Sequence, residues 1–238
     1  MAENYKQIRT LSIKFDLNIR YEDIPKFRGA VVNLTKEKND LFHNHSEDGL
    51  IYRYPKIQYK KTGGKAAILC IDEGTEAIED FFAGFNQQFI FGTEAMELKV
   101  EEIKARQYNV RLWDETFDYR LANWLPLNQE NYKQFHEVES LHEKTAILEK
   151  VLTGNLLTFC EGIELAPDRP VKAFITKIVN EKRIRYRGTV MQSYDVDIRT
   201  NISLPDNIGL GKGSAVGYGV VSIINNSHKP GTNKMTTK

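Results

Sequence analysis

The alternation of polar and apolar residues divides the first part of the chain into short strands. Residues 5–19 and 51–61 alternate in part and predict strands, and residues 66–72 predict a more buried strand. The TGGK sequence at 62–65 predicts a tight turn that joins the second strand to the third as a hairpin. Further strand is predicted within residues 85–113.

Two helices are predicted between these strands. The first begins near Pro25 and has one apolar face, made of Ile24, Phe27, Val31 and Leu34. The second covers residues 72–84, opening with acids and closing at Gly84. Residues 41–49 (LFHNHSEDG) are too polar and irregular for either element and predict a loop. The resulting order is that of the ferredoxin-like β-α-β-β-α-β unit.

The second half shows a similar order of elements. A strand is predicted around Tyr119–Trp124, a long helix over 140–159, strands within 171–204 and a last strand at 220–225. We therefore expect an α+β protein made of tandem ferredoxin-like (RRM-like) domains with antiparallel sheets. The expected domains are residues 1–115 and 116–225, followed by a disordered polar tail at 226–238.

Composition is that of an ordinary globular protein, with 41% hydrophobic and 27% charged residues. The sequence has no apolar run long enough to span a membrane and no apolar stretch typical of a signal peptide, so we expect the cytoplasm. Cys70 and Cys160 lie in apolar surroundings and are expected to be core residues. Net charge is only +1, but residues 51–71 contain five basic residues and no acid, and 172–187 contain six against one acid. Taken alone, either stretch also fits a solvated face.

Residues 209–219 read GLGKGSAVGYG, and five of these eleven are glycine. The segment does not fit a phosphate-binding P-loop, because Lys212 is followed by Gly213. It does not fit a dinucleotide fingerprint either, because the glycine spacing is wrong and a strand follows. A glycine-rich hairpin or bulge is one interpretation. The other is a backbone that a phosphodiester can approach closely, with exposed N–H groups and Lys212 to bind phosphate oxygens.

His43 and His45 form an H-N-H sequence in the loop after the first predicted helix. They could form a metal site, but no cysteine or third clear ligand stands near them. They could be solvated, or they could act as an acid–base pair in RNA cleavage. In such cleavage the 2′-hydroxyl is the nucleophile, and the protein supplies a base, an acid and donors for the phosphorane charge. Histidine suits both proton-transfer roles near neutral pH.

The glycine spacing is more specific than its composition. A G-h-G triplet, five residues that include a lysine, and a second G-h-G triplet precede the last strand, where h is Leu210 or Tyr218. In a chain with two ferredoxin-like halves, this pattern resembles the CRISPR-associated endoribonucleases of the RAMP superfamily, which cut repeat RNA into guide units. The resemblance covers the layout from the first strand to about Ile224.

The resemblance implies a metal-independent endoribonuclease with no cofactor. It would cleave CRISPR repeat RNA (pre-crRNA) and leave 2′,3′-cyclic phosphate and 5′-hydroxyl ends. The catalytic loop of this family lies where His43 and His45 lie, and one branch has two histidines there. We expect Tyr52 to orient the phosphate, with Tyr54 as the alternative, and Lys60 or Lys61 to stabilise the phosphorane.

The basic stretches and the glycine segment are the expected RNA contacts. These are Arg53, Lys56, Lys61, Lys177, Arg185, Arg187, Gly209, Gly211, Lys212, Gly213, Gly217 and Gly219. A CRISPR effector complex is a further expected partner, and either a monomer or a homodimer fits. Two alternatives stay open at this point: a non-catalytic RAMP subunit that holds guide RNA, and a ferredoxin-like protein that binds a small phosphate ligand or another protein.

Overall fold

The computed structural model describes residues 5–35, 40–42, 53–85 and 88–224, together with the backbone of 45–46 and 49–50. His43, Tyr52 and the expected tail at 226–238 lie outside the described residues. The strands of the first half are β1 (Tyr5–Asn18), β2 (His45–Ser46), β3 (Gly49–Leu50), β4 (Ile57–Thr62), β5 (Lys65–Ile71), β6 (Phe89–Phe91) and β7 (Glu94–Met96). Its helices are η1 (Tyr21–Asp23), α1 (Ile24–Leu34) and α2 (Gly74–Ala83).

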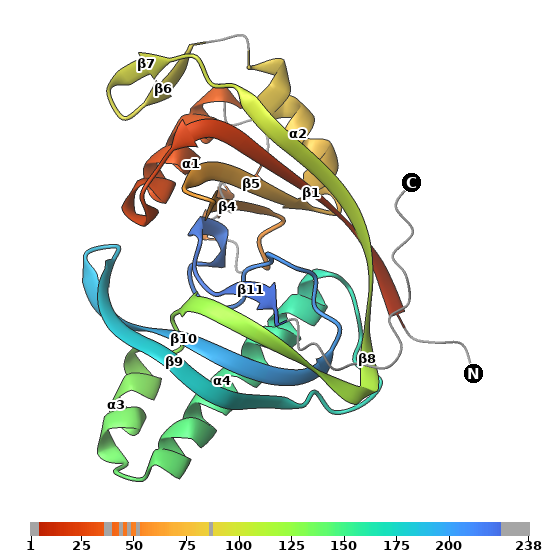
Figure 1. Ribbon diagram of the computed structural model, residues 1–238, viewed down its shortest axis with the longest axis vertical. Coiled ribbons are helices and arrows are strands. Elements are labelled where there is room, and N and C mark those ends of the chain that lie inside the picture. Colours follow the sequence, from red (N-terminus) through yellow and green to blue (C-terminus); the bar gives the residue numbers. More distant parts are fainter. Residues whose placement is uncertain are drawn as a thin grey trace.

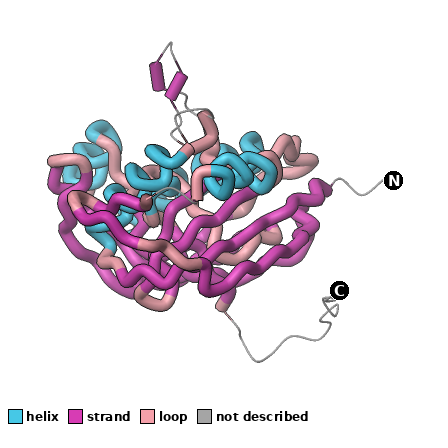
Figure 2. Tube along the Cα trace, turned by 90° about the horizontal axis from the view of Figure 1, so that it is seen from above, coloured by secondary structure: helices cyan, strands magenta, loops and turns pink. Residues whose placement is uncertain are grey.

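The second half begins within the long strand β8 (Val100–Trp124). The later elements are α3 (Gln129–Glu137), α4 (Leu141–Gly162), β9 (Ala173–Tyr186), β10 (Thr189–Ile202), η2 (Ser214–Val216) and β11 (Val220–Ile223). Helix α3 was not predicted from the sequence. Figure 2 shows the described helices gathered along one side of the strands.

The first half forms an antiparallel sheet in the order β4-β5-β1-β8, and α1 and α2 pack against it. This is the ferredoxin-like order expected from the sequence. The expected strand at 51–61 begins only at Ile57, because Pro55 cannot donate to a strand ladder. The β4–β5 hairpin turns at Gly63 and Gly64, which both have positive φ (58° and 85°), as a two-residue turn of this hand requires.

The second half repeats the arrangement with one change. Its strands lie in the order β9-β10-β8-β11, and all pairs are antiparallel. Helix α4 occupies the place of the first ferredoxin-like helix. The place of the second helix, between β10 and β11, is taken by residues 203–219, which contain the glycine segment and the single turn η2. The glycine segment therefore replaces an element of the fold.

Strand β8 joins the two halves without a break (Figure 1). It pairs with β1 through residues 100–111 and with β10 through residues 112–124. The expected domain division at 115/116 falls inside this strand and stays a prediction.

Two clusters of buried apolar side chains form the core. One lies between the first sheet and its helices and includes Phe15, Phe27 and Phe81. The other crosses from one half to the other, because Ile8 and Ile71 of the first sheet pack with residues of the second half, among them Leu210. Cys70 and Cys160 are both buried, as expected. None of the described helices is long and apolar enough to cross a membrane.

Candidate functional site

The histidine segment begins at a fixed point on the first half. Phe42 directly precedes His43, and its side chain is buried in the core beside α1. The carbonyl oxygen of Phe42 accepts hydrogen bonds from Arg28 Nε (3.4 Å) and from Tyr59 Oη (3.3 Å). His45 lies in β2, paired with Leu50 of β3, and its side chain is outside the described residues. Phe42, the residue before His43, is therefore held beside Arg28 and Tyr59.

Arg28 belongs to a cluster of aromatic and basic side chains that comes from both halves. Burial lowers the pKa of Arg28, the charge of Arg187 lowers it further, and the hydroxyls of Tyr59 and Tyr186 act in the opposite direction. Arg187 follows β9 at the β9–β10 turn, and Tyr186 beside it packs against the core cluster that contains the apolar face of α1. Sequence analysis did not select Arg28. Its position four residues after Ile24 places it at the edge of the apolar face of α1, which was the available signal.

The glycine segment meets the same cluster. Tyr218 packs edge-to-face on Tyr186 with ring centroids 5.3 Å apart. The Lys212 ammonium lies 5.8 Å from the centre of the Tyr186 ring, and the Arg187 guanidinium lies 5.6 Å from it. Three cations thus lie near Tyr186: Arg187, Lys212 and Arg28, and Arg28 is also hydrogen-bonded to Phe42 at the start of the histidine segment. Such a site attracts an anion.

The glycines of the segment have packing reasons. Gly211, Gly213, Gly217 and Gly219 all have positive φ, between 61° and 85°, where side chains with a Cβ are strained. A Cβ on Gly217 would lie 2.6 Å from Ile24 Cδ1, and one on Gly213 would lie 2.9 Å from the Tyr218 ring. The segment therefore uses glycine to fit against α1 and against itself. Gly209, Gly217 and Gly219 are buried, whereas Lys212 is exposed and Gly211 and Gly213 are partly exposed.

A buried glutamine holds the segment on the first half. Gln58 Oε1 accepts a hydrogen bond from the Gly209 N–H at 2.8 Å. The amide nitrogen of Gln58 donates to Tyr54 Oη and to the Pro55 carbonyl, both at 3.1 Å. Tyr54 is itself buried against Phe159, with ring centroids 5.2 Å apart, and burial raises its pKa. Tyr54, which was the alternative to Tyr52, thus packs in the interface between the two halves.

Strand alternation separates the two candidate lysines of β4. Lys61 lies on the same face as Tyr59, and its ammonium is 5.3 Å from the centre of the Tyr21 ring. Lys60 lies on the face of Gln58 and is 4% exposed. Its Nζ has no hydrogen-bond partner within the described part of the chain. Burial lowers the pKa of Lys60 to about 7, against a smaller opposing effect of the Asp206 charge.

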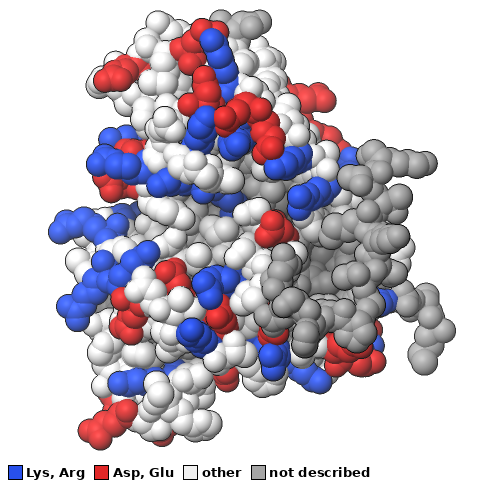
Figure 3. Space-filling view, in the orientation of Figure 1, with Lys and Arg blue, Asp and Glu red and all other residues white. Residues whose placement is uncertain are grey.

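The remaining expected RNA contacts differ in exposure. Arg53, Lys177 and Arg185 are exposed. Lys56 is buried, and its Nζ lies 3.0 Å from a Glu73 oxygen and 3.5 Å from an Asp72 oxygen, so its charge is balanced inside the fold. Lys and Arg side chains gather at the left edge of the face in Figure 3, where Figure 1 places the tip of the β9–β10 hairpin.

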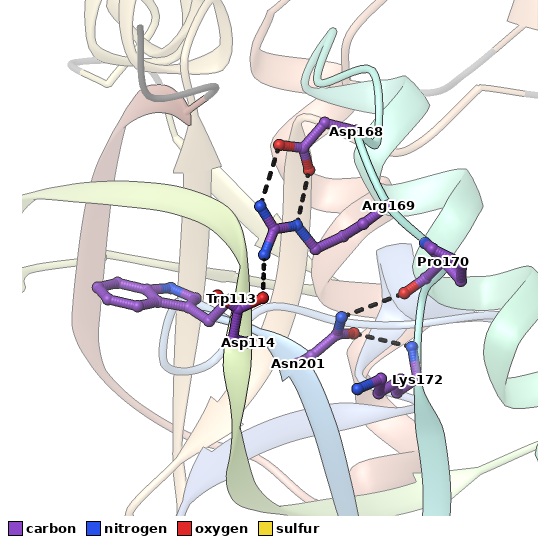
Figure 4. Close-up of a pocket in the computed structure, with 7 residues that line it drawn as sticks. All are labelled: Trp113, Asp114, Asp168, Arg169, Pro170, Lys172 and Asn201. Carbon is purple, nitrogen blue, oxygen red and sulfur yellow. Dashed lines mark hydrogen bonds and ion pairs between the residues drawn. The ribbon is translucent and has the colours of Figure 1, made fainter. Parts of the chain in front are cut away.

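A cavity of about 390 Å³ lies where β8 passes from the first sheet to the second, beside the loop that precedes β9. Figure 4 shows Arg169 between Asp168 and Asp114, and Asn201 holding the loop through the Pro170 carbonyl and the Lys172 N–H (3.1 and 2.8 Å). The charges of the two acidic and two basic side chains that line this cavity balance, so the cavity does not favour an anion. Within the described residues, no group of three or more His, Cys, Asp or Glu side chains is placed to hold a metal ion.

Two ferredoxin-like halves, joined by one strand and with a glycine segment in place of a helix, define the chain as a tandem ferredoxin-like protein. Family models match nearly the whole chain: the Cas6b N-terminal domain at residues 6–109 and the Cas6b C-terminal domain at residues 111–224. The chain therefore belongs to the Cas6b family.

The chain is also similar to individual proteins. The chain is similar to a crystal structure of Cas6b, with a TM-score of 0.80 and 19% identity over 92% of this chain and 100% of that one. It is also similar to the CRISPR RNA processing endoribonuclease Cas6b, with a TM-score of 0.68 and 19% identity over the same shares. An uncharacterized protein of Methanocaldococcus jannaschii is 25% identical over 101 residues, which is 42% of this chain and 67% of that protein.

Proposed function

We propose that this chain is an endoribonuclease that cleaves CRISPR repeat RNA. The observation that carries the proposal is the cluster of Arg28, Arg187 and Lys212 beside Phe42, the residue before His43. It joins an anion-binding site built from both halves to the segment with two histidines. The similar structure described as a CRISPR RNA processing endoribonuclease supports the substrate class.

The proposed chemistry uses the RNA as its own nucleophile. One of His43 and His45 removes the proton of the 2′-hydroxyl, and the other protonates the 5′-oxygen that leaves. Tyr52 orients the scissile phosphate. The products are a 2′,3′-cyclic phosphate and a 5′-hydroxyl, and the proton balance closes without a metal ion or a cofactor.

Charge develops on the phosphorane oxygens, and a fixed cation next to them stabilises the transition state. Arg28 suits this role, because its hydrogen bond to the Phe42 carbonyl holds the guanidinium at the entry to the histidine segment. Lys61 is the second candidate, since it shares the Tyr59 face of β4. We place Lys60 outside this role, because it lies on the opposite face and is buried.

The RNA backbone would follow the basic surface from Arg53 and Lys61 to the glycine segment and then along β9. Lys212 supplies a charge there, and the partly exposed backbone of Gly211 and Gly213 allows phosphate to come close. Lys177, Arg185 and Arg187 would extend the contacts along the hairpin. Lys56 is left out of this surface because Glu73 and Asp72 already neutralise it. We propose that the protein acts in the cytoplasm and delivers its product to an effector complex.

Cleavage of labelled CRISPR repeat RNA in the presence of EDTA tests the proposal. We expect wild-type protein to cut, and a 2′-deoxy substitution at the cut site to abolish cutting. His43→Ala and His45→Ala should each slow single-turnover cleavage at least about 100-fold, as loss of a general acid or base does, while RNA affinity changes little. The matched control is His142→Ala, an exposed histidine on α4.

A non-catalytic subunit that holds guide RNA is the competing function. Tight binding of repeat RNA by the wild type without any cutting would support it and contradict the nuclease. Cutting that persists with the deoxy substrate would instead overturn the proposed nucleophile.

A further inference from the structure

A second cavity lies on the second half of the chain. It has a volume of about 240 Å³ and lies between α3, α4 and the β9–β10 hairpin. Figure 1 shows both helices beside the sheet there. Its walls combine the apolar side chains of Phe135, Leu148 and Ile178 with polar groups of Glu181, Gln192 and Tyr194. Apolar walls with a few polar groups are typical of a ligand site.

Tyr194 is a buried polar side chain that lines this cavity. It is 1% exposed, and its hydroxyl has no hydrogen-bond partner within the described residues. Burial raises its pKa, and the charge of Glu181, which also lines the cavity, raises it further. A buried hydroxyl without a partner is costly, and few native polar groups remain so. The hydroxyl therefore lies where a ligand's acceptor would satisfy it.

The cavity also offers a carboxylate and aromatic rings. Glu181 Oε1 accepts a hydrogen bond from the Gln192 amide, and within the described residues no donor is paired with Oε2. Because each carboxylate oxygen can accept two hydrogen bonds, both oxygens can still receive donors from a ligand. Phe135 and Tyr194 pack edge-to-face with ring centroids 6.4 Å apart. Aromatic rings, a carboxylate and a hydroxyl donor are what proteins use to hold an unstacked RNA base by its face and its Watson–Crick edge.

Positive charge continues along the same face of the sheet. In the β9–β10 register, Glu181 pairs with Tyr194, Arg183 with Gln192, and Arg185 with Val190. Paired residues two positions apart share one face, so Arg183 and Arg185 follow the cavity in order toward the hairpin tip. Both arginines are exposed. A nucleotide seated in the cavity would thus have cations for its flanking phosphates on the way to Arg187.

We infer that this cavity binds one unstacked nucleobase of the RNA, with Glu181 and Tyr194 reading its edge and Arg183 and Arg185 holding the neighbouring phosphates. The inference rests on the proposed RNA-processing function and adds a specificity site to it. Guanine fits best, because it places two N–H donors side by side for the carboxylate and an acceptor beside them for the tyrosine hydroxyl.

Two conservative substitutions test the edge contacts. Tyr194→Phe keeps the ring, and we expect it to weaken binding of repeat RNA about 3- to 10-fold. Glu181→Gln should also weaken binding, although removing a negative charge would by itself strengthen it. Tyr5→Phe and Glu79→Gln are the matched controls, because both residues are exposed and lie on the first half.

Photo-crosslinking of wild-type protein to repeat RNA that carries 6-thioguanosine locates the base. The inference expects adducts on Phe135, His136 or Tyr194, identified by mass spectrometry. Wild-type cutting, with unchanged affinity in both variants and no adduct there, would overturn the nucleobase site and leave the nuclease intact. Self-association that both variants abolish, with RNA affinity unchanged, would assign the cavity to a second copy and also overturn it. Absence of both RNA binding and cutting in the wild type would remove the proposed function together with the inference.

Discussion

Lys60 shows at the residue scale how the fold changes a charged side chain. Its aliphatic stem and its ammonium are both buried at the contact between β4 and the glycine segment, and only the charge of Asp206 offsets the desolvation. The charged form is therefore disfavoured in the folded protein. Lys61 is the next residue but is partly exposed and stacks near Tyr21. The two neighbouring lysines thus differ in burial.

The pKa of Lys60 predicts a pH-dependent stability. The folded-state pKa is about 7, and the unfolded value is about 10.4. Between these values the unfolded chain binds more protons, so this group makes the free energy of unfolding rise with pH by up to about 1.4 kcal/mol per pH unit. Below pH 7 both states are protonated, and the full cost of burying the charge remains. Lys60→Met should therefore stabilise most at pH 6 and least near pH 10.

Urea denaturation of the wild type and Lys60→Met at pH 6, 7.5 and 9 measures this difference. Lys61→Met, which removes the neighbouring, partly exposed lysine of the same strand, is the matched control. A gain from Lys60→Met that is the same at all three pH values would contradict the burial of a charge and would indicate packing alone.

The glycine segment is the element that departs most from the repeated topology. It replaces a helix with a tight path that packs against Ile24, Gln58 and Tyr186. Gly219 is the most constrained position, because it has a φ of 61° and a Cβ there would collide with the Leu210 carbonyl oxygen. That carbonyl belongs to the backbone and cannot rotate away.

Gly219→Ala should destabilise the protein more than a positive φ alone explains. Gly92→Ala is the matched control, because Gly92 has a φ of 68° and nothing lies within 4 Å of the added Cβ. We expect a loss of about 1–2 kcal/mol for Gly92→Ala from backbone strain. For Gly219→Ala we expect about 1–3 kcal/mol more from overlap. Equal losses in thermal or urea denaturation would show that the segment relaxes around the added methyl group.

The elements differ in how far the sequence could predict them. Alternation and turn residues found the β4–β5 hairpin and both helices of the first half, because these signals are local. Helix α3 was missed, since only Phe135 of its residues is buried and its apolar pattern is weak. The glycine spacing indicated the family, but its contacts with Ile24 and Asn155 depend on residues far away in the sequence.

The site was predictable only in part for the same reason. A basic stretch in the sequence does not show that Lys56 is neutralised by Glu73, or that Lys60 and Lys61 face opposite sides of a strand. Arg28 was missed because its neighbours Arg187 and Tyr186 come from the other half. The roles of His43, His45 and Tyr52 stay predictions.

At the scale of the whole molecule, the two halves share a strand and a core. Strand β8 is hydrogen-bonded into both sheets, and Ile8 and Ile71 of the first half are buried among residues of the second. A fragment that ended near residue 110 would expose these side chains to water. Breaking one half therefore removes contacts that stabilise the other, and the chain should behave as one cooperative unit.

Cooperative unfolding of the full chain is the consequence that can be measured. Both tryptophans, Trp113 and Trp124, lie in the second half, so their fluorescence follows that half while far-UV circular dichroism follows the whole chain. The two probes should give one coincident transition. Ile13→Val, a change of about 1 kcal/mol in the core of the first half, should shift both transitions equally. If the fluorescence transition stays in place while the dichroism transition moves, the halves unfold separately and β8 does not couple them.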